Sequence, residues 1–263
     1  MKFSYTTTGN WENAFRGLRH PLESYAKSDS IFSFTGDVEL DDGYCDEVVN
    51  SYVENWKDER TDPNKEEIKE WLWHNGNIET GDHAFQSAYI GSNDLDLAQR
   101  MIKAGSPNDK FLRQIFVSVD ITGPLYWWKE LDTYKVGTVA NSTSTMHKLA
   151  TTPITIDCFE TDDYDGSVLL DNKYGLNFME DELIPVLESL RLKYLETKDK
   201  RYWKELIRWL PEGWMQTRTF TCNYAVLRNI IHWRQGHKLT EWASFIDWCR
   251  SLPYAEELLF YAQ

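Results

Sequence analysis

Three side chains with hydrogen-bonding chemistry lie at fixed spacings in the C-terminal third of the chain. Asn223 and Asn229 are six residues apart, and Arg234 follows five residues later. The residues between them are largely apolar at helical spacing, which predicts a helix over 223–234. Side chains at these spacings do not share one narrow stripe of a helix, so they face different partners or the helix is almost surrounded by protein. They either contact a ligand, or the asparagines cap or cross-link neighbouring segments and Arg234 forms an ion pair.

The segment 136–147 is a second candidate, because it is crowded with hydroxyl groups and small side chains. Such a sequence cannot build a core. It is therefore either a surface connection or a loop whose hydroxyls and backbone N–H groups hold a phosphate. Upstream, Thr122-Gly123-Pro124 predicts a turn after a strand, followed by a helix from Leu125 to about Lys135.

Hydrophobic periodicity predicts the elements that position these candidates. Strands are expected at 31–36 and over 114–121 (Gln114 to Ile121). Helices are expected at about 64–74, 94–104, 178–197, 200–209, 223–234 and 239–251. Asn93-Asp94 and Thr240 are expected helix N-caps, and Gly105 an expected helix end.

The number and order of these elements predict the fold class and the domain organisation. Strands are few and do not alternate strictly with helices, which predicts an α+β fold with a mainly antiparallel sheet flanked by helices. No repeat and no Pro-rich or Gly/Ser-rich linker divides the chain, so a single domain over 1–263 is expected.

Several classes of chemistry find no support in the sequence. It contains no phosphate-binding Gly-rich motif, no His-Glu-x-x-His and no Gly-x-Ser-x-Gly. The four cysteines and six histidines have no metal-ligand spacing, so no metal is expected. The cysteines are Cys45, Cys158, Cys222 and Cys249, and the histidines are His20, His74, His83, His147, His232 and His237.

Charge limits the possible partners. The chain of 263 residues has a formal net charge of −14, which argues against a nucleic acid polymer as partner. Residues 198–250 nevertheless hold ten Lys/Arg against five Asp/Glu, so a small anion would be held there. Within this region Lys198, Lys200, Arg201 and Lys204 fit a solvated helix face. The absence of a signal-like apolar core or a membrane-length apolar run predicts a soluble, cytoplasmic protein without membrane contact.

The order of these pieces resembles the flavin-dependent thymidylate synthases, the ThyX family. In that family a strand runs into a Pro-initiated helix and then into the motif Arg-His-Arg-x-x-Ser-x-Asn-x-x-Ser-x-Arg-Tyr. Much later a helix carries Asn, a second Asn six residues on and Arg five residues further, the spacing of Asn223, Asn229 and Arg234. Pro211 also lies upstream, where the family commonly has a proline. The resemblance covers about 110–150 and 205–252.

The signature motif is altered in this chain. Thr133-Tyr134-Lys135 stands in place of Arg-His-Arg, and Met146-His147 in place of the final Arg-Tyr. The lost arginine helps the family to hold and polarise the uracil nucleotide. Lys135 keeps a positive point charge for a phosphate but lacks the bidentate fork of an arginine. The resemblance is weakest over about 1–105, which would be a divergent part, and around 156–200, which would be an insertion.

The resemblance implies roles for ten residues. Those expected to bind the cofactor FAD are Gln114, Lys135, Thr138, Asn223 and Asn229. Those expected to bind the substrate are Glu130, Asn141, Ser144, Arg208 and Arg234. No catalytic residue is assigned.

The family activity implies what the whole protein would do. Reduced FAD works with methylenetetrahydrofolate to methylate dUMP, NADPH reduces the flavin, and the protein supplies orientation and electrostatics. The resemblance thus implies a homotetrameric transferase of thymidylate biosynthesis. Because the motif is altered, a second hypothesis is a catalytically inactive nucleotide- or flavin-binding protein of the same fold. A phage origin would be consistent with such a protein. A purely structural role is the third.

Overall fold

The computed structural model describes residues 1–34, 86–144, 149–162, 164–165 and 177–263. The chain packs into two compact units. Unit 1 comprises Met1–Lys2, Ile121–Tyr134 and Ala140–Thr219, and unit 2 comprises Phe3–Asp120, Lys135–Val139 and Phe220–Gln263. The predicted helix over 64–74 lies outside the described residues, and the single domain over 1–263 stays a prediction.

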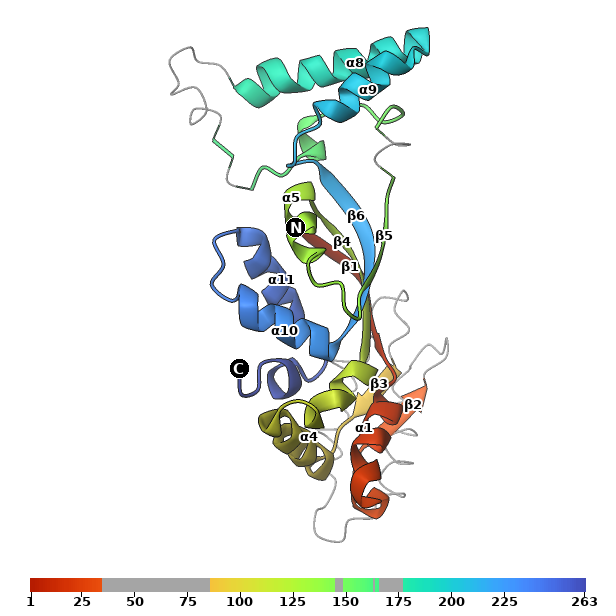
Figure 1. Ribbon diagram of the computed structural model, residues 1–263, viewed down its shortest axis with the longest axis vertical. Coiled ribbons are helices and arrows are strands. Elements are labelled where there is room, and N and C mark those ends of the chain that lie inside the picture. Colours follow the sequence, from red (N-terminus) through yellow and green to blue (C-terminus); the bar gives the residue numbers. More distant parts are fainter. Residues whose placement is uncertain (35–85, 145–148, 163, 166–176) are drawn as a thin grey trace, which may run out of the picture. The chain divides into compact units, whose positions relative to one another are not determined.

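The main sheet is antiparallel and has four strands (Figure 1). Their order is β1 (Lys2–Gly9), β4 (Phe116–Pro124), β6 (Met215–Asn223) and β5 (Val139–Ser142). This arrangement confirms the predicted α+β fold with a mainly antiparallel sheet. The strand predicted over 114–121 is β4, which begins two residues later than expected.

Three strands of this sheet, β1, β5 and β6, were not predicted from the sequence. The segment 136–147, interpreted as a connection or a phosphate loop, contains β5. A second, two-stranded sheet pairs β2 (Ile31–Phe34) with β3 (Gln86–Tyr89), and β2 lies within the predicted 31–36.

Side chains alternate between the two faces of β4. Val117, Val119 and Ile121 are buried, as expected for residues that point to the same side of a strand. The residues between them face the other way and include two hydroxyls that pair with β6. Ser118 Oγ lies 2.9 Å from Thr221 Oγ1, and Thr122 Oγ1 lies 2.7 Å from Thr217 Oγ1. One face of this strand pair therefore packs apolar groups and the other carries cross-strand hydroxyl pairs.

Each described α-helix except α1 corresponds to a predicted one, although α5 and α8 are shorter than predicted. They are α1 (Trp11–Arg19), α4 (Ser92–Ala104), α5 (Leu125–Leu131), α8 (Ile184–Thr197), α9 (Lys200–Arg208), α10 (Tyr224–Arg234) and α11 (Thr240–Arg250). Two segments are π-helical. The first, η5 (Phe178–Leu183), leads into α8, and the second, η6 (Ala255–Leu259), follows α11. Short 3-10 segments are η1 (His20–Leu22), η2 (Tyr25–Lys27), η3 (Asn108–Gln114) and η4 (Ile156–Cys158).

Helix α5 is shorter than predicted and ends at Leu131 rather than near Lys135. The N–H of Thr133 donates to the carbonyl of Glu130, and the N–H of Tyr134 donates to that of Leu131. These bonds span three residues, so the last turn tightens and the helix stops. The Thr133 hydroxyl also donates to the Glu130 carbonyl at 2.7 Å.

The two predicted N-caps are wrong, whereas the predicted helix end is confirmed. Helix α4 begins after Gly91, and the Asp29 carboxylate accepts from the N–H groups of Asn93 and Asp94 at 2.8 and 3.1 Å. Thr240 is the first residue of α11 instead of its cap. Gly105 ends α4 with a φ of 72°, which glycine adopts without strain.

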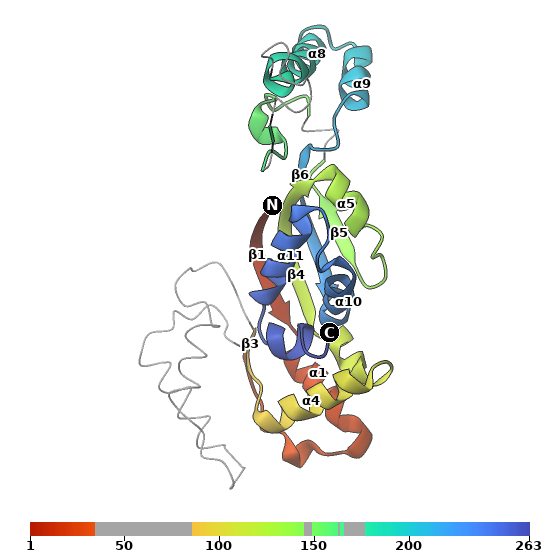
Figure 2. The same cartoon turned by 90° about the vertical axis from the view of Figure 1, so that its left-hand side faces the viewer.

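Each unit has its own apolar core. In unit 2, the Trp11 ring meets Tyr224 edge-on at 5.2 Å, and Phe15 meets Phe111 at 5.8 Å. In unit 1, helices α8 and α9 lie side by side (Figure 2). Its buried cluster is formed by Leu149, Ile154, Phe159, Met179, Leu187 and Leu206.

A buried carboxylate joins distant segments of unit 2. Asp94 is completely buried, and its Oδ1 accepts from Arg19 Nε at 2.5 Å. Its Oδ2 accepts from the hydroxyls of Ser28 and Ser30, each at 2.6 Å. Arg19 is itself only 4% exposed, so the two charges compensate each other out of contact with water.

Replacing Asp94 by Asn should destabilise the protein by about 3–5 kcal/mol, because the buried Arg19 then loses its counter-charge. Urea unfolding measures this change. The matched control is Asp96→Asn on the same helix, where Asp96 and Arg100 form an exposed pair and a loss of only about 0.3–0.5 kcal/mol is expected. Equal losses in the two variants would contradict this assignment.

Candidate functional site

Asn223 lies at the junction between β6 and α10, where it is the N-cap of the helix. Its Oδ1 accepts from the N–H of Val226 at 3.0 Å. This is the capping role that the sequence left open, and it satisfies one of the backbone donors that a helix start leaves unpaired. The N–H of Tyr224 donates to the carbonyl of Ile115, which ties the junction to the segment before β4.

The amide nitrogen of Asn223 points toward the turn between α5 and β5. A Cβ atom on Gly137 would lie 3.3 Å from Asn223 Nδ2 and 3.4 Å from Val226 Cγ2. Gly137 has a φ of 78°, which only glycine adopts readily. The turn also carries Lys135, which is exposed, and Thr138, which is half-buried. The structure thus brings Lys135 and Thr138 onto the same short turn that packs against Asn223.

Asn229 and Arg234 lie farther along the same helix. The eleven residue steps from Asn223 to Arg234 correspond to about 16 Å of helix axis. Asn229 is exposed in the middle of α10. These three residues therefore suit a long ligand or two ligands, and not a single small group.

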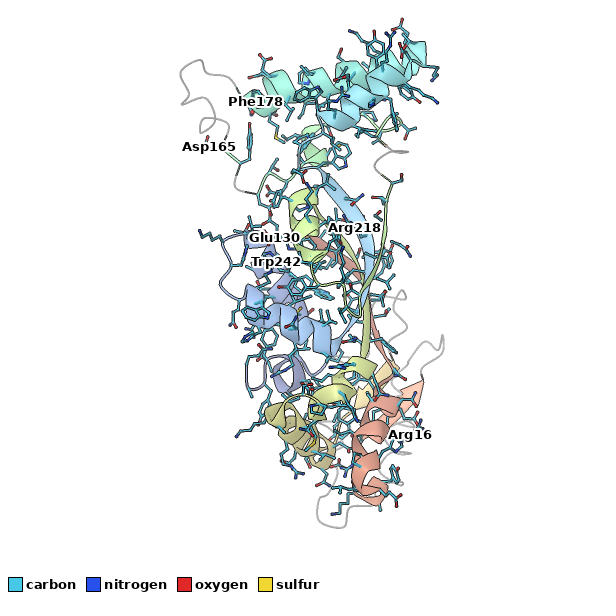
Figure 3. The ribbon with its side chains drawn as sticks, in the orientation of Figure 1. Arg16, Glu130, Asp165, Phe178, Arg218 and Trp242 are labelled. Carbon is cyan, nitrogen blue, oxygen red and sulfur yellow. The ribbon has the colours of Figure 1, made fainter. Side chains whose placement is uncertain are left out.

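The guanidinium of Arg234 is held by aromatic neighbours. It stacks over the ring of Trp242 at 4.6 Å, and its Nη1 lies 3.2 Å from His237 Nε2. Trp242 is completely buried and is labelled in Figure 3. A stacked, half-buried guanidinium has its direction fixed before a ligand arrives.

Gln114 does not lie on a strand, which corrects the sequence interpretation. It is the last residue of η3, and its carbonyl accepts from Asn10 Nδ2 at 2.8 Å. Its side-chain oxygen lies 3.0 Å from where a Cβ on Gly17 would be. The side chain is thus directed toward α1.

The ten predicted residues fall in different units. Those of unit 2 are Gln114, Lys135, Thr138, Asn223, Asn229 and Arg234, and those of unit 1 are Glu130, Asn141, Ser144 and Arg208. Glu130 and Ser144 are half-buried, and Asn141 is exposed on β5. Arg208 is exposed at the end of α9 and pairs with Glu205.

Sequence reasoning missed a polar cluster in unit 1. Arg218 on β6 lies over the buried ring of Trp128 at 4.4 Å and donates to both carboxylate oxygens of Asp132 at 3.0 and 3.1 Å. Arg218 and Glu130 are labelled in Figure 3. The available signal was the β-branched and aromatic residues Thr217, Thr219, Phe220 and Thr221, which are typical of a strand.

Two thiols of unit 2 are unsuited to nucleophilic chemistry. Burial raises the pKa of the Cys222 thiol, which directly precedes Asn223, and burial also raises that of Cys249. Both groups therefore stay protonated at neutral pH. The polar groups of this region can bind and orient a ligand, whereas these two cysteines cannot attack it.

The likeness of this chain to known proteins is structural. No protein-family profile matches the sequence. No curated protein matches it either. A crystal structure of the flavin-dependent thymidylate synthase ThyX from Helicobacter pylori, complexed with FAD and dUMP, matches 99% of this chain and 98% of its own, with a TM-score of 0.56 and 14% identity. The two proteins share a fold.

A second solved structure, Thymidylate Synthase X from Helicobacter pylori with FAD and dUMP, is similar over 65% of this chain and 82% of its own. Its identity is 18% and its TM-score 0.47.

Among the described residues, no helix is both long enough and apolar enough to cross a membrane. The same residues contain no group of three or more His, Cys, Asp or Glu that could hold a metal ion.

Replacing Gly137 by Ala should disturb the contact with Asn223, since the new methyl group is strained at a positive φ and also crowds Nδ2. Gly236 is the matched control, because its φ is 74° and nothing lies within 4 Å of its Cβ position. Gly236→Ala should cost about 1 kcal/mol from backbone strain alone, and Gly137→Ala should cost more. Thermal unfolding of the two variants tests this, and an identical loss would show that the Asn223 contact contributes nothing.

Proposed function

We propose that this protein binds FAD and a pyrimidine deoxynucleotide, dUMP, as a divergent flavin-dependent thymidylate synthase. The observation that carries the proposal is the shared fold over nearly the whole of both chains, since the ThyX structure holds FAD and dUMP. A homotetrameric assembly, a cytoplasmic location, and NADPH and methylenetetrahydrofolate as co-substrates belong to the same proposal.

The residues around the Gly137 turn have the chemistry that a flavin nucleotide requires. Lys135 offers an ammonium group, Thr138 a hydroxyl and Asn223 an amide nitrogen, all of which donate to phosphate or carbonyl oxygens. The close approach of Gly137 to Asn223 keeps a side chain out of this turn. FAD would be held by these residues together with Asn229. Gln114, whose side chain is directed toward α1, stays only a prediction of the resemblance.

The bound FAD would supply the hydride, whose electrons come from NADPH, while methylenetetrahydrofolate would supply the one-carbon unit. The residues of this chain would bind and orient. Arg234, prepositioned on Trp242, would donate to the carbonyl oxygens of the uracil base. Within unit 1, Glu130, Asn141, Ser144 and Arg208 stay the nucleotide contacts that the resemblance predicts.

A binding protein without turnover is the second candidate, and a specific contact favours it. Thr133 and Tyr134 replace two residues of the family motif, and their backbone N–H groups close the end of α5. The Thr133 hydroxyl is directed at the Glu130 carbonyl. These two residues therefore stabilise a helix end in place of presenting charge to a ligand.

The first experiment is the visible absorption spectrum of the purified protein, before and after addition of FAD with and without dUMP, with a sizing run alongside. A bound flavin band with NADPH oxidation that depends on dUMP supports the enzyme. Flavin or nucleotide binding without NADPH oxidation supports the binding protein. A protein that binds neither ligand would contradict both.

Replacing Arg234 by Ala should weaken dUMP binding by about tenfold or more, because a charge-assisted contact to the base is lost. Arg250→Ala is the matched control, since Arg250 on α11 also stacks on an aromatic ring, that of Phe260 at 4.0 Å, but has no predicted ligand role. Each variant should lose about 0.5–1 kcal/mol of stability from the stacking. Isothermal titration with dUMP separates them, and equal dUMP affinities would exclude the role of Arg234.

A further inference from the structure

Gln216 on β6 is one of the few buried polar residues among those described, at 8% exposure. Its Oε1 accepts from Arg218 Nε at 2.9 Å, and its Nε2 donates to the Thr143 carbonyl at 2.9 Å. Its own backbone carbonyl accepts from the indole N–H of Trp128, also at 2.9 Å. Both ends of the amide and the backbone are thus fixed.

Arg218 determines which way this amide points. Its guanidinium is held from two directions, by stacking on Trp128 and by the Asp132 carboxylate. An arginine only donates, so Gln216 must present its oxygen to Arg218 and its nitrogen to Thr143. The result is a directed relay that runs from Asp132 through Arg218 and Gln216 to the Thr143 carbonyl, all within unit 1.

Thr143 lies in the segment that carries two of the proposed nucleotide contacts, Asn141 and Ser144. Val139 to Thr143 are all exposed, so none of their side chains anchors the segment by burial. Thr143 is held instead by its neighbours on β6. Its N–H and hydroxyl donate to the Thr217 carbonyl at 2.9 and 3.2 Å, and Gln216 binds its carbonyl from the other side.

We propose that Gln216 is a positioning residue for this segment, and that the Asp132–Arg218–Gln216 relay orients Asn141 and Ser144 toward the phosphate of the bound nucleotide. The inference rests on the proposed function for the identity of the ligand. Its physical basis is preorganisation, because a segment already ordered loses less conformational entropy when a phosphate binds. The relay also lies outside the residues assigned to FAD.

The test is Gln216→Glu, which keeps the size of the side chain and its acceptor toward Arg218. It places a carboxylate oxygen against the Thr143 carbonyl, so the bond that holds the segment is replaced by repulsion. We expect dUMP to bind about tenfold more weakly, with FAD affinity unchanged within about twofold. In the ligand-free protein, amide hydrogen exchange at Thr143 should be about tenfold faster.

Two further variants keep the test decisive. Asp132→Asn, at a half-exposed position, weakens the far end of the relay and should give a smaller change of the same sign. Ser118→Ala removes a hydroxyl pair between the same two strands but in unit 2, and should leave dUMP binding unchanged. If Gln216→Glu fails to fold, the dUMP affinities of these two variants still test the proposal.

The outcomes separate the positioning role from the proposed function. Wild-type protein that binds no dUMP overturns the proposed function and the ligand named here. Unchanged exchange at Thr143 in Gln216→Glu overturns the positioning role, whatever the ligand. A parallel loss of FAD binding, dUMP binding and melting temperature also overturns it, because that pattern is the one expected of a purely structural residue.

Discussion

The hydrogen bond between the Val226 N–H and the Asn223 side chain fixes the point at which β6 becomes α10. A strand that turns directly into a helix leaves backbone donors unpaired, and the side chain of the last strand residue satisfies one of them. The junction sets the register of both elements. It therefore places Gln216 and Arg218 upstream on the strand, and Asn229 and Arg234 downstream on the helix. It also brings the Asn223 amide against Gly137, where a larger residue would crowd it.

Planar groups stacked on aromatic rings recur where polar side chains need a fixed direction. Arg234 lies over Trp242, Arg218 over Trp128 and Arg250 over Phe260. Such stacking holds a guanidinium without neutralising it, because the ring offers its electron-rich face while the N–H groups stay available at the edge. The many tryptophans of the chain thus fill its cores and also orient charged groups beside them.

The residues at the end of α5 make structural contacts within unit 1. Thr133 and Tyr134 close the end of α5, and Asp132, the first residue after that helix, binds Arg218. The fold shared with the ThyX structure at 14% identity depends on burial and backbone pairing rather than on the identity of such side chains.

The sequence by itself determined most helices, strand β4 and the end of α4 at Gly105. Each of these follows from a local pattern, such as the alternation of Val117, Val119 and Ile121 or the conformational freedom of glycine. Only the tertiary structure decided that Asn223 caps a helix, that Asp29 rather than Asn93 caps α4, and that Gln216 binds Thr143. The last pair is 73 residues apart, and Arg218 and Asp132 are 86 apart. Contacts over such distances arise from strand pairing and packing, which local spacing does not encode.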